Sequence, residues 1–201
     1  VRDAEVNVES AQIALEKLKI QKSNENMNAD LAKAYDDGFN IVSNVFLDLP
    51  GIMTSLNDMF LKSSAGTGQQ WNIDWIEAQV FSADSDTVKP LKQNFIDAYQ
   101  TALKSYNDSF NNYSSGSRMS DNTTIEKFIS RTYDTEKLIS NAIKNANNYL
   151  DFVNASIQKK GNAATPALFT TLQANLNGHT SKTNAHLQNL LVAKEHQARY
   201  R

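Results

Sequence analysis

The residues best suited to acid–base or metal chemistry in this chain are its three histidines, which all lie near the C-terminus. His179 and His186 are seven residues apart, so on a helix they share one face about 10 Å apart along the axis. That separation is too large for one metal ion, because two histidine ligands on a helix are typically four residues apart. Together with His196 they are interpreted as solvated or interhelical side chains, and no metal ligands are predicted.

Acidic and glycine-rich motifs offer little other chemistry. Asp36 and Asp37 are neighbours, and adjacent side chains on a helix point in different directions, so they do not form a carboxylate dyad. The segment DSD at 84–86 resembles the start of a calcium loop, but the closing glutamate of an EF-hand is missing, and helix capping is the better interpretation.

The segment SSAGTGQQ at 63–70 has a G-x-G pattern, but neither a P-loop lysine nor a preceding strand accompanies it. No Ser-His-Asp arrangement follows from the residue spacing. We therefore predict no catalytic residues, no cofactor-binding residues and no cofactor, and we do not expect an enzyme.

The composition limits the classes of partner. The chain has 20 basic and 22 acidic residues, so its charge gives no reason to expect nucleic acid as a partner. It has no cysteine, which excludes disulfides, zinc–thiolate sites and thiol catalysis. No apolar run approaches the roughly 18 residues of a membrane-spanning helix, so membrane insertion is not expected, and no small-molecule substrate is evident.

Apolar residues recur at three- and four-residue steps in most of the chain, which is typical of amphipathic helices. The periodic segments are 2–22, 29–49, 88–113, 123–160 and 166–201. Residues 23–28 are either a polar part of one continuous helix or a short break. Shorter helices are expected after Pro50 and around 71–81. The sequence therefore predicts an all-α fold, an elongated antiparallel helical bundle with four long helices and one or two short ones, in a single domain over 1–201.

Prolines are expected at helix boundaries, because proline disrupts a helix interior. The three are Pro50, Pro90 and Pro166. Leu49-Pro50-Gly51 is interpreted as a corner between packed helices, with Asp48 capping the helix that starts at Pro50.

Three further local features are expected. Gly38 falls on an apolar stripe, which indicates close approach of a neighbouring helix. Thr123 and Glu126 have the spacing of a capping box. The aromatic stripe that includes Phe95, Tyr99 and Phe110 is expected in the core.

Trp71 and Trp75 are four residues apart and form a candidate partner surface if both are exposed on one face. The alternative is that they cap the end of the bundle. The basic segment KEHQARYR near the C-terminus is interpreted as a solvated helix end.

Several segments resemble the helical region of HlyD-type periplasmic adaptors, also called membrane fusion proteins. The first is RDAEVNVESAQIALEKLK, which is similar to the helical hairpin of that family. The second, LAKAYDDGFNIVSNVFLDLPGIMTSLNDMF, is similar to a helical insertion in a subset of bacterial HlyD-family secretion proteins. The later segments AYQTALKSYNDSFNNY, TIEKFISRTYDTEKLISNAIKNANNYLDF and GHTSKTNAHLQNLLVAKE are similar to later parts of that insertion.

The resemblance implies a fragment of a larger adaptor, in which 1–49 and 166–201 are helices that continue a stalk and 50–165 are inserted helices. It implies a structural, protein–protein assembly role in bacterial cell-envelope transport or secretion. The expected partners are further copies in a ring and other transport components, and the expected location is the extracytoplasmic cell envelope. Lipoyl-like β segments, a β-barrel and a membrane anchor would lie outside the chain, and no channel-binding tip motif is recognised in it.

Two other functions stay open from the sequence. The first is a scaffold or interaction protein of another envelope or phage machine, such as a minor pilus component or a tail protein. The second is a helical pore-forming toxin, which would require a concealed apolar hairpin.

Overall fold

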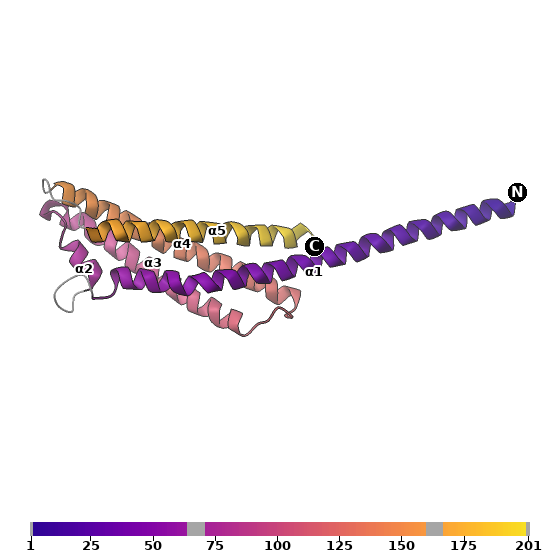
Figure 1. Cartoon of the computed structure of the whole chain (residues 1–201), viewed down its shortest axis with the longest axis horizontal. Helices are drawn as coiled ribbons and strands as arrows, with labels where there is room; N and C mark the ends of the chain where they lie inside the picture. The colour runs from indigo at the N-terminus through magenta and orange to yellow at the C-terminus, as the bar shows by residue number, and fades with distance from the viewer. Residues whose placement is uncertain (1, 64–70, 160–166, 200–201) are drawn as a thin grey trace.

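A computed structural model of the chain describes residues 2–63, 71–159 and 167–199 (Figure 1). In chain order the elements are α1 (Arg2–Phe60), α2 (Asn72–Glu77), the 3-10 helix η1 (Ser82–Asp84), α3 (Ser85–Ser114), α4 (Asn122–Lys159) and α5 (Ala167–Arg199). No strand occurs within these described ranges, and the predicted all-α class with four long helices is confirmed.

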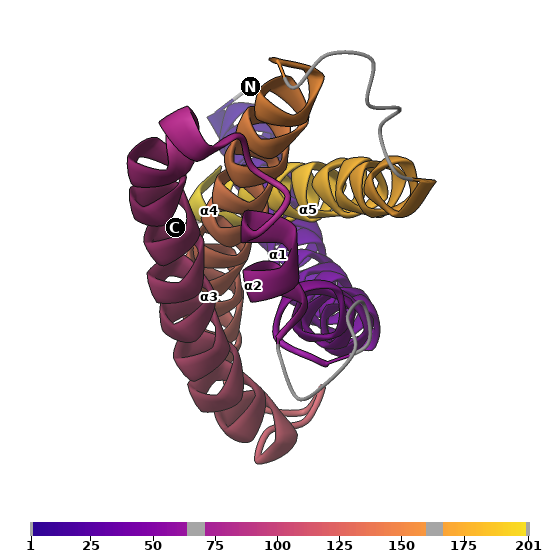
Figure 2. The ribbon, with the colours of Figure 1, turned by 90° about the vertical axis from the view of Figure 1, so that its left-hand side faces the viewer.

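The four long helices form an elongated antiparallel bundle (Figure 1). The helices α1 and α4 run in one direction along the long axis, whereas α3 and α5 run in the other. The central helix is α4, because it packs against α1, α3 and α5. Helix α3 lies at the side of the bundle, as the end-on view in Figure 2 shows, and it contacts α4 far more than α1.

The expected corner at Leu49-Pro50-Gly51 is wrong, because α1 continues through it. Pro50 and Gly51 are exposed on the solvent side of the helix, so the proline ring displaces no packed side chain of the core. On the opposite side Leu49, Ile52 and Leu56 are fully buried. Burial of each such side chain stabilises the folded protein by about 1.5–3 kcal/mol. Together they exceed the roughly 3 kcal/mol that an interior proline costs.

The continuity of α1 corrects three further expectations. The short helix expected after Pro50 is the last part of α1, so the boundary expected between 1–49 and 50–165 falls inside one helix. Asp48 is not a helix cap, and its carboxylate instead binds side chains of α5. Residues 23–28 are helical, so they are a polar part of one continuous helix.

The other prolines differ in their positions. Pro90 is exposed and lies inside α3, in its second turn, so its expected place at a helix boundary is wrong. Its solvent-facing side leaves the carbonyl group one turn earlier accessible to water. Pro166 lies outside the described residues, and α5 begins at the following residue, Ala167.

The aromatic stripe of α3 is buried only in part. Phe95 is 0% exposed and lies 4.6 Å from Phe60 between ring centroids, and Tyr99 is 5% exposed, so both are core residues as predicted. Phe110 is 39% exposed, so its expected place in the core is wrong. The reason is that α3 is covered mainly by α4 and contacts α1 much less. The Phe110 ring meets the Phe46 ring of α1 in an edge-to-face arrangement.

The short helix α2 closes one end of the bundle. Its Ile73 and Ile76 are fully buried, and the Ile73 carbonyl oxygen accepts a hydrogen bond of 2.8 Å from the Tyr149 hydroxyl group of α4. Lys92 of α3 binds both acidic side chains of α2, Asp74 and Glu77. The end of the bundle is therefore fixed by apolar burial and a two-acid ion pair.

Two predictions about helix contacts have different outcomes. The close approach at Gly38 is confirmed, because a Cβ atom there would lie 2.6 Å from the Ile129 side chain of α4. The capping box is wrong, because the backbone N–H of Thr124 donates to the Asp121 carboxylate at 2.9 Å. Asp121 precedes the first helical residue, so its oxygen reaches the free N–H first. Glu126 instead accepts a hydrogen bond from the Tyr35 hydroxyl group of α1.

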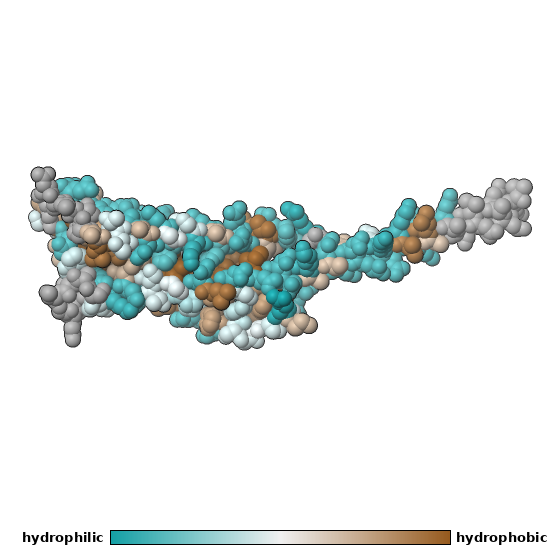
Figure 3. All heavy atoms as spheres, in the orientation of Figure 1, coloured by the Kyte–Doolittle hydropathy of each residue, from teal (hydrophilic) through white to brown (hydrophobic). Residues whose placement is uncertain are grey.

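Residues 2–30 of α1 project beyond the bundle, and we call this segment the arm (Figure 1). Every side chain of the arm from residue 12 onward is exposed. Five of them are large and apolar, and in Figure 3 brown residues interrupt an otherwise mostly teal arm. These exposed residues are Ile13, Leu15, Leu18, Ile20 and Met27.

Candidate functional site: a charged cluster between three helices

Four ionisable side chains from three helices meet between α1, α4 and α5, and we call them the charged cluster. Glu136 and His186 are buried, whereas the side chains of Asp48 and Lys182 reach the surface. They are Asp48 of α1, Glu136 of α4, and Lys182 and His186 of α5. His186 lies in the middle, since its Nδ1 atom contacts Glu136 Oε1 and its Nε2 atom is 3.2 Å from Asp48 Oδ2. Lys182 donates to Asp48 Oδ1 at 2.9 Å.

The helices place these groups by simple periodicity. Lys182 and His186 are four residues apart, so they lie on one face of α5 and both reach the same carboxylate on α1. Glu136 follows the buried face of α4, four residues after Thr132 and three residues before Ile139. A side chain at this position points into the core whatever its polarity.

Glu136 is the most unusual member of the charged cluster. It is 0% exposed, and its second oxygen, Oε2, is buried without a hydrogen-bond partner. Burial raises the pKa of its carboxyl group, and the nearby His186 opposes this shift only in part. Because a carboxyl group in such a place favours a bound proton, Glu136 is suited to share a proton with the imidazole ring.

The pKa values of the two carboxyl groups beside the His186 ring shift in opposite directions: that of Glu136 is raised and that of Asp48 is lowered. Burial lowers the pKa of His186, but the hydrogen bond and charge of Glu136, with those of Asp48, outweigh burial and raise it. The hydrogen bond from Lys182 lowers the pKa of Asp48, so this carboxyl group stays ionised at lower pH. The charged cluster therefore combines an Asp48–Lys182 ion pair with a Glu136–His186 pair in which both groups bind a proton more tightly than in the unfolded chain.

This geometry does not suit hydrolytic or metal chemistry. In a hydrolase triad one ring nitrogen of the histidine faces the nucleophile. Both ring nitrogens of His186 face carboxylates, so neither can accept a proton from a nucleophile. In the part of the chain that the structure describes, no group of three or more His, Asp or Glu side chains can hold a metal ion.

The histidines match the prediction of solvated or interhelical side chains. His186 and His179 are both interhelical, and His179 Nε2 is 2.8 Å from the Ser55 hydroxyl oxygen of α1. Burial lowers the pKa of His179, in contrast to His186. His196 is exposed. Sequence reasoning did not identify Glu136, although a charged residue in the apolar register of α4 was a usable signal.

Asp84 is another acidic residue with an unexpected role. It occupies the N-cap position of α3, but its side chain makes no capping hydrogen bond, so the predicted capping role is wrong. Its carboxylate accepts a hydrogen bond of 2.7 Å from the Ser156 hydroxyl group and forms an ion pair of 3.0 Å with Lys159, both on α4. These contacts lower the pKa of Asp84 and fix the start of α3 to the end of α4.

The two tryptophans of the candidate partner surface lie in different environments. Trp71 precedes α2 and is 49% exposed. Trp75 is half-buried and packs against the core. Only Trp71 is therefore available on the surface, and the pair does not form one exposed face. The glycine-rich segment at 64–70 lies outside the described residues.

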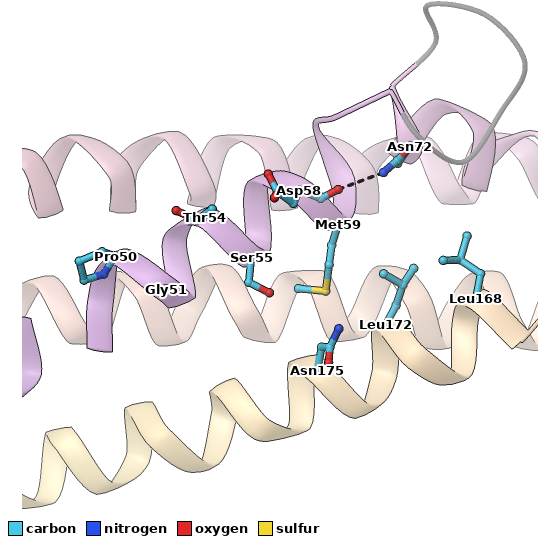
Figure 4. Close-up of a pocket in the computed structure, with 10 residues that line it drawn as sticks. All are labelled: Pro50, Gly51, Thr54, Ser55, Asp58, Met59, Asn72, Leu168, Leu172 and Asn175. Atoms are coloured by element: carbon cyan, nitrogen blue, oxygen red, sulfur yellow. Dashed lines mark hydrogen bonds between the residues drawn. The ribbon is translucent and has the colours of Figure 1, made fainter. Parts of the chain in front are cut away.

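A groove between α1 and α5 occupies the place of the expected corner (Figure 4). Its volume is about 670 Å³, and Pro50, Gly51 and Leu172 are among the residues that line it. Gly51 opens the groove, because its missing side chain would meet nothing within 4 Å. Asp58, the charged residue of the lining, is paired with Lys62 at 2.6 Å, so it offers no free charge to a ligand.

Within the described ranges, no helix combines the length and apolar character needed to cross a membrane. Comparison with protein-family models, with curated proteins and with solved structures finds no match to this chain. The assignment of a function therefore depends on the chain's own geometry and sequence.

Proposed function

We propose that this chain is a non-enzymatic helical domain of a bacterial cell-envelope transport or secretion adaptor of the HlyD type. Its role in this proposal is structural, and it assembles through helix–helix contacts with further copies and with other transport components. The observation that carries the proposal is the arm, which extends a core helix of the bundle into solvent while exposing five large apolar side chains.

The arm has the pattern of a helix that packs against others. Ile13, Ile20 and Met27 are spaced by seven residues and share one face, whereas Leu15 and Leu18 lie on the other side of the helix. A helix gains most of its stability from burying such faces, not from intrinsic propensity. Two separate apolar faces favour contacts with two neighbouring helices, as in a bundle of stalk helices.

The antiparallel course of α5 beside α1 supports the same interpretation. Helix α5 returns antiparallel beside α1 and ends near the base of the arm (Figure 1). The buried residues of α5 that follow this course are Thr183, His186, Leu190, Ala193 and Gln197. In the proposed adaptor, α1 and α5 are the two stalk helices, and the arm continues the stalk toward the membrane-proximal body.

Crosslinking tests the assembly part of this proposal. Because the chain has no cysteine, a Leu18→Cys variant of the full-length protein, with any cysteine outside this region replaced by serine, reports only contacts of the arm. We expect a bismaleimide reagent to give crosslinked homo-oligomers in the cell-envelope fraction. The matched control is Asn148→Cys, on the exposed face of α4, which should stay monomeric after the same treatment.

The outcome separates the adaptor from its rivals. A Leu18→Cys protein that crosslinks no better than Asn148→Cys, or that fractionates away from the envelope, contradicts the proposal. The encoding gene provides a second test, because an adaptor requires lipoyl-like β segments on both sides of this region. Envelope oligomers without such segments would instead favour a scaffold protein of another envelope machine.

A further inference from the structure

Helix α5 is held to the bundle by two chemically different halves. Its N-terminal half buries three large apolar side chains: Phe169, Leu172 and Leu176. Its C-terminal half buries a mixture of small, polar and apolar side chains: Thr183, His186, Leu190, Ala193 and Gln197. The Gln197 amide nitrogen is itself buried without a hydrogen-bond partner. The C-terminal half therefore depends on the charged cluster more than the N-terminal half does.

We propose that Glu136, His186 and Asp48 form a pH-dependent lock on the C-terminal half of α5. The lock is closed while Glu136 and His186 share a proton, and it opens when that proton is lost. Opening moves the C-terminal half of α5 away from α1 and α4, while the apolar N-terminal half stays anchored. This inference concerns the bundle and is independent of the proposed adaptor role.

The balance of charge explains the closed state. The charged groups that face His186 are Glu136 from α4 and Asp48 from α1, and Lys182, on α5 itself, binds the far side of Asp48. With one shared proton, the Glu136–His186 pair has no net charge and Asp48 is balanced by Lys182. Every negative group of the charged cluster then has a partner.

Loss of the proton removes this balance. Glu136 becomes a carboxylate that is 0% exposed, with Oε2 unpartnered and a neutral ring as its neighbour. An uncompensated buried charge is strongly unfavourable, and access to water is the direct relief. His186, which is 8% exposed, covers Glu136 from the side of α5, so water reaches the carboxylate when this part of α5 moves outward.

The direction of the pH effect follows from the two raised pKa values. Glu136 and His186 both bind protons more tightly in the folded protein than in the unfolded chain, where their pKa values are about 4.5 and about 6.5. The stabilisation they provide is therefore fully present below those values and is lost as the pH rises through the raised values of the folded state.

The acid side behaves differently because of Asp48. A second proton on the Glu136–His186 pair leaves an imidazolium ion beside a carboxylate that is still ionised, since the pKa of Asp48 is lowered. That positive charge has a partner 3.2 Å away. The lock therefore stays closed at mildly acidic pH and opens toward alkaline pH.

Hydrogen exchange of the full chain tests the lock. After correction for intrinsic exchange rates, we expect the protection of backbone amides in Thr183–Arg199 to fall at least about ten-fold between about pH 5 and about pH 9. The amides around Phe169–Leu176 should change less than about two-fold. In Glu136→Gln, which cannot ionise, the fall in the C-terminal half should be below about two-fold.

Two controls keep the test decisive. His196→Gln changes an exposed histidine of the same helix and should behave as the wild type does. If Glu136→Gln does not fold, the NMR titration of the His186 ring in the wild type replaces it, and its midpoint should match that of the loss of protection. A C-terminal half whose protection is flat across this pH range while His186 titrates overturns the proposal, as does a Glu136→Gln protein with the wild-type response.

Discussion

The two parts of α1 show how differently one helix can be stabilised. From residue 34 onward most of its apolar side chains are buried against α4 and α5, and Val42, Leu49 and Leu56 are each 0% exposed. Leu47, which is 80% exposed, is an exception. In the arm the apolar residues Leu18 and Ile20 are more than half exposed. Both parts are helical, so backbone conformation does not distinguish them.

The difference shows which part of the helix holds the fold together and which part is available to a partner. The buried part tolerates an interior proline at Pro50, because packing exceeds the backbone cost. From residue 12 to residue 30 the arm gains no comparable burial from the part of the chain that the structure describes. Its apolar side chains are therefore free to contribute to assembly, whereas those of the bundle are already committed to folding.

The largest expected effect is in the bundle core. Phe95→Ala removes a ring that is 0% exposed and that contacts Phe60, so we expect a loss of about 3–5 kcal/mol in the free energy of unfolding. Phe110→Ala is the matched control on the same helix. Because its ring is 39% exposed, its loss should be about 1–2 kcal/mol. Urea unfolding followed by circular dichroism measures both, and equal losses would contradict the assignment of the core.

The sequence predicted the fold well wherever apolar residues recur regularly. The stripe with Phe95 and Tyr99 marked α3, and the glycine on the stripe at Gly38 correctly indicated a close helix contact. It failed at Pro50 and Phe110, for one physical reason. Local pattern does not show how much a neighbouring helix covers, and coverage decides whether a proline is tolerated and whether an aromatic ring is buried.

The charged cluster was harder to predict than the fold. The seven-residue spacing of His179 and His186 correctly placed both side chains on one face of α5, where each contacts another helix. Their partners Ser55, Asp48 and Glu136 lie 50 to 138 residues away in the chain. No local pattern pairs them, because the pairing follows from the register between helices that only tertiary packing fixes.

Two glycines of α1 give an intermediate effect and sharpen the comparison along the helix. Gly38→Ala would place a methyl group 2.6 Å from the end of the Ile129 side chain and 3.0 Å from the Gln197 amide, so these two side chains must shift. Overpacking of this kind costs about 1–3 kcal/mol. The gain of about 1 kcal/mol from replacing a helical glycine offsets this in part, so we expect a net loss of up to about 2 kcal/mol.

Gly51→Ala is the control for that loss, since nothing lies within 4 Å of its added methyl group. It should stabilise the protein by about 0.5–1 kcal/mol through helix propensity alone. Thermal unfolding of the two variants side by side tests the prediction. Two shifts of the same sign would mean that the helices around Gly38 are not packed as closely as the structure describes.

The smallest effect on stability is expected in the arm. Leu18→Gln replaces a side chain that is 64% exposed and contacts no other part of the bundle core, so the free energy of unfolding at low protein concentration should change by less than about 0.5 kcal/mol. Association should respond instead, because the same change removes apolar area from the face with Leu15. Sedimentation equilibrium of wild type and variant measures it. A Leu18→Gln protein that unfolds more easily as a monomer would show that the arm packs on its own bundle, and the contrast between the two parts of α1 would then be one of degree.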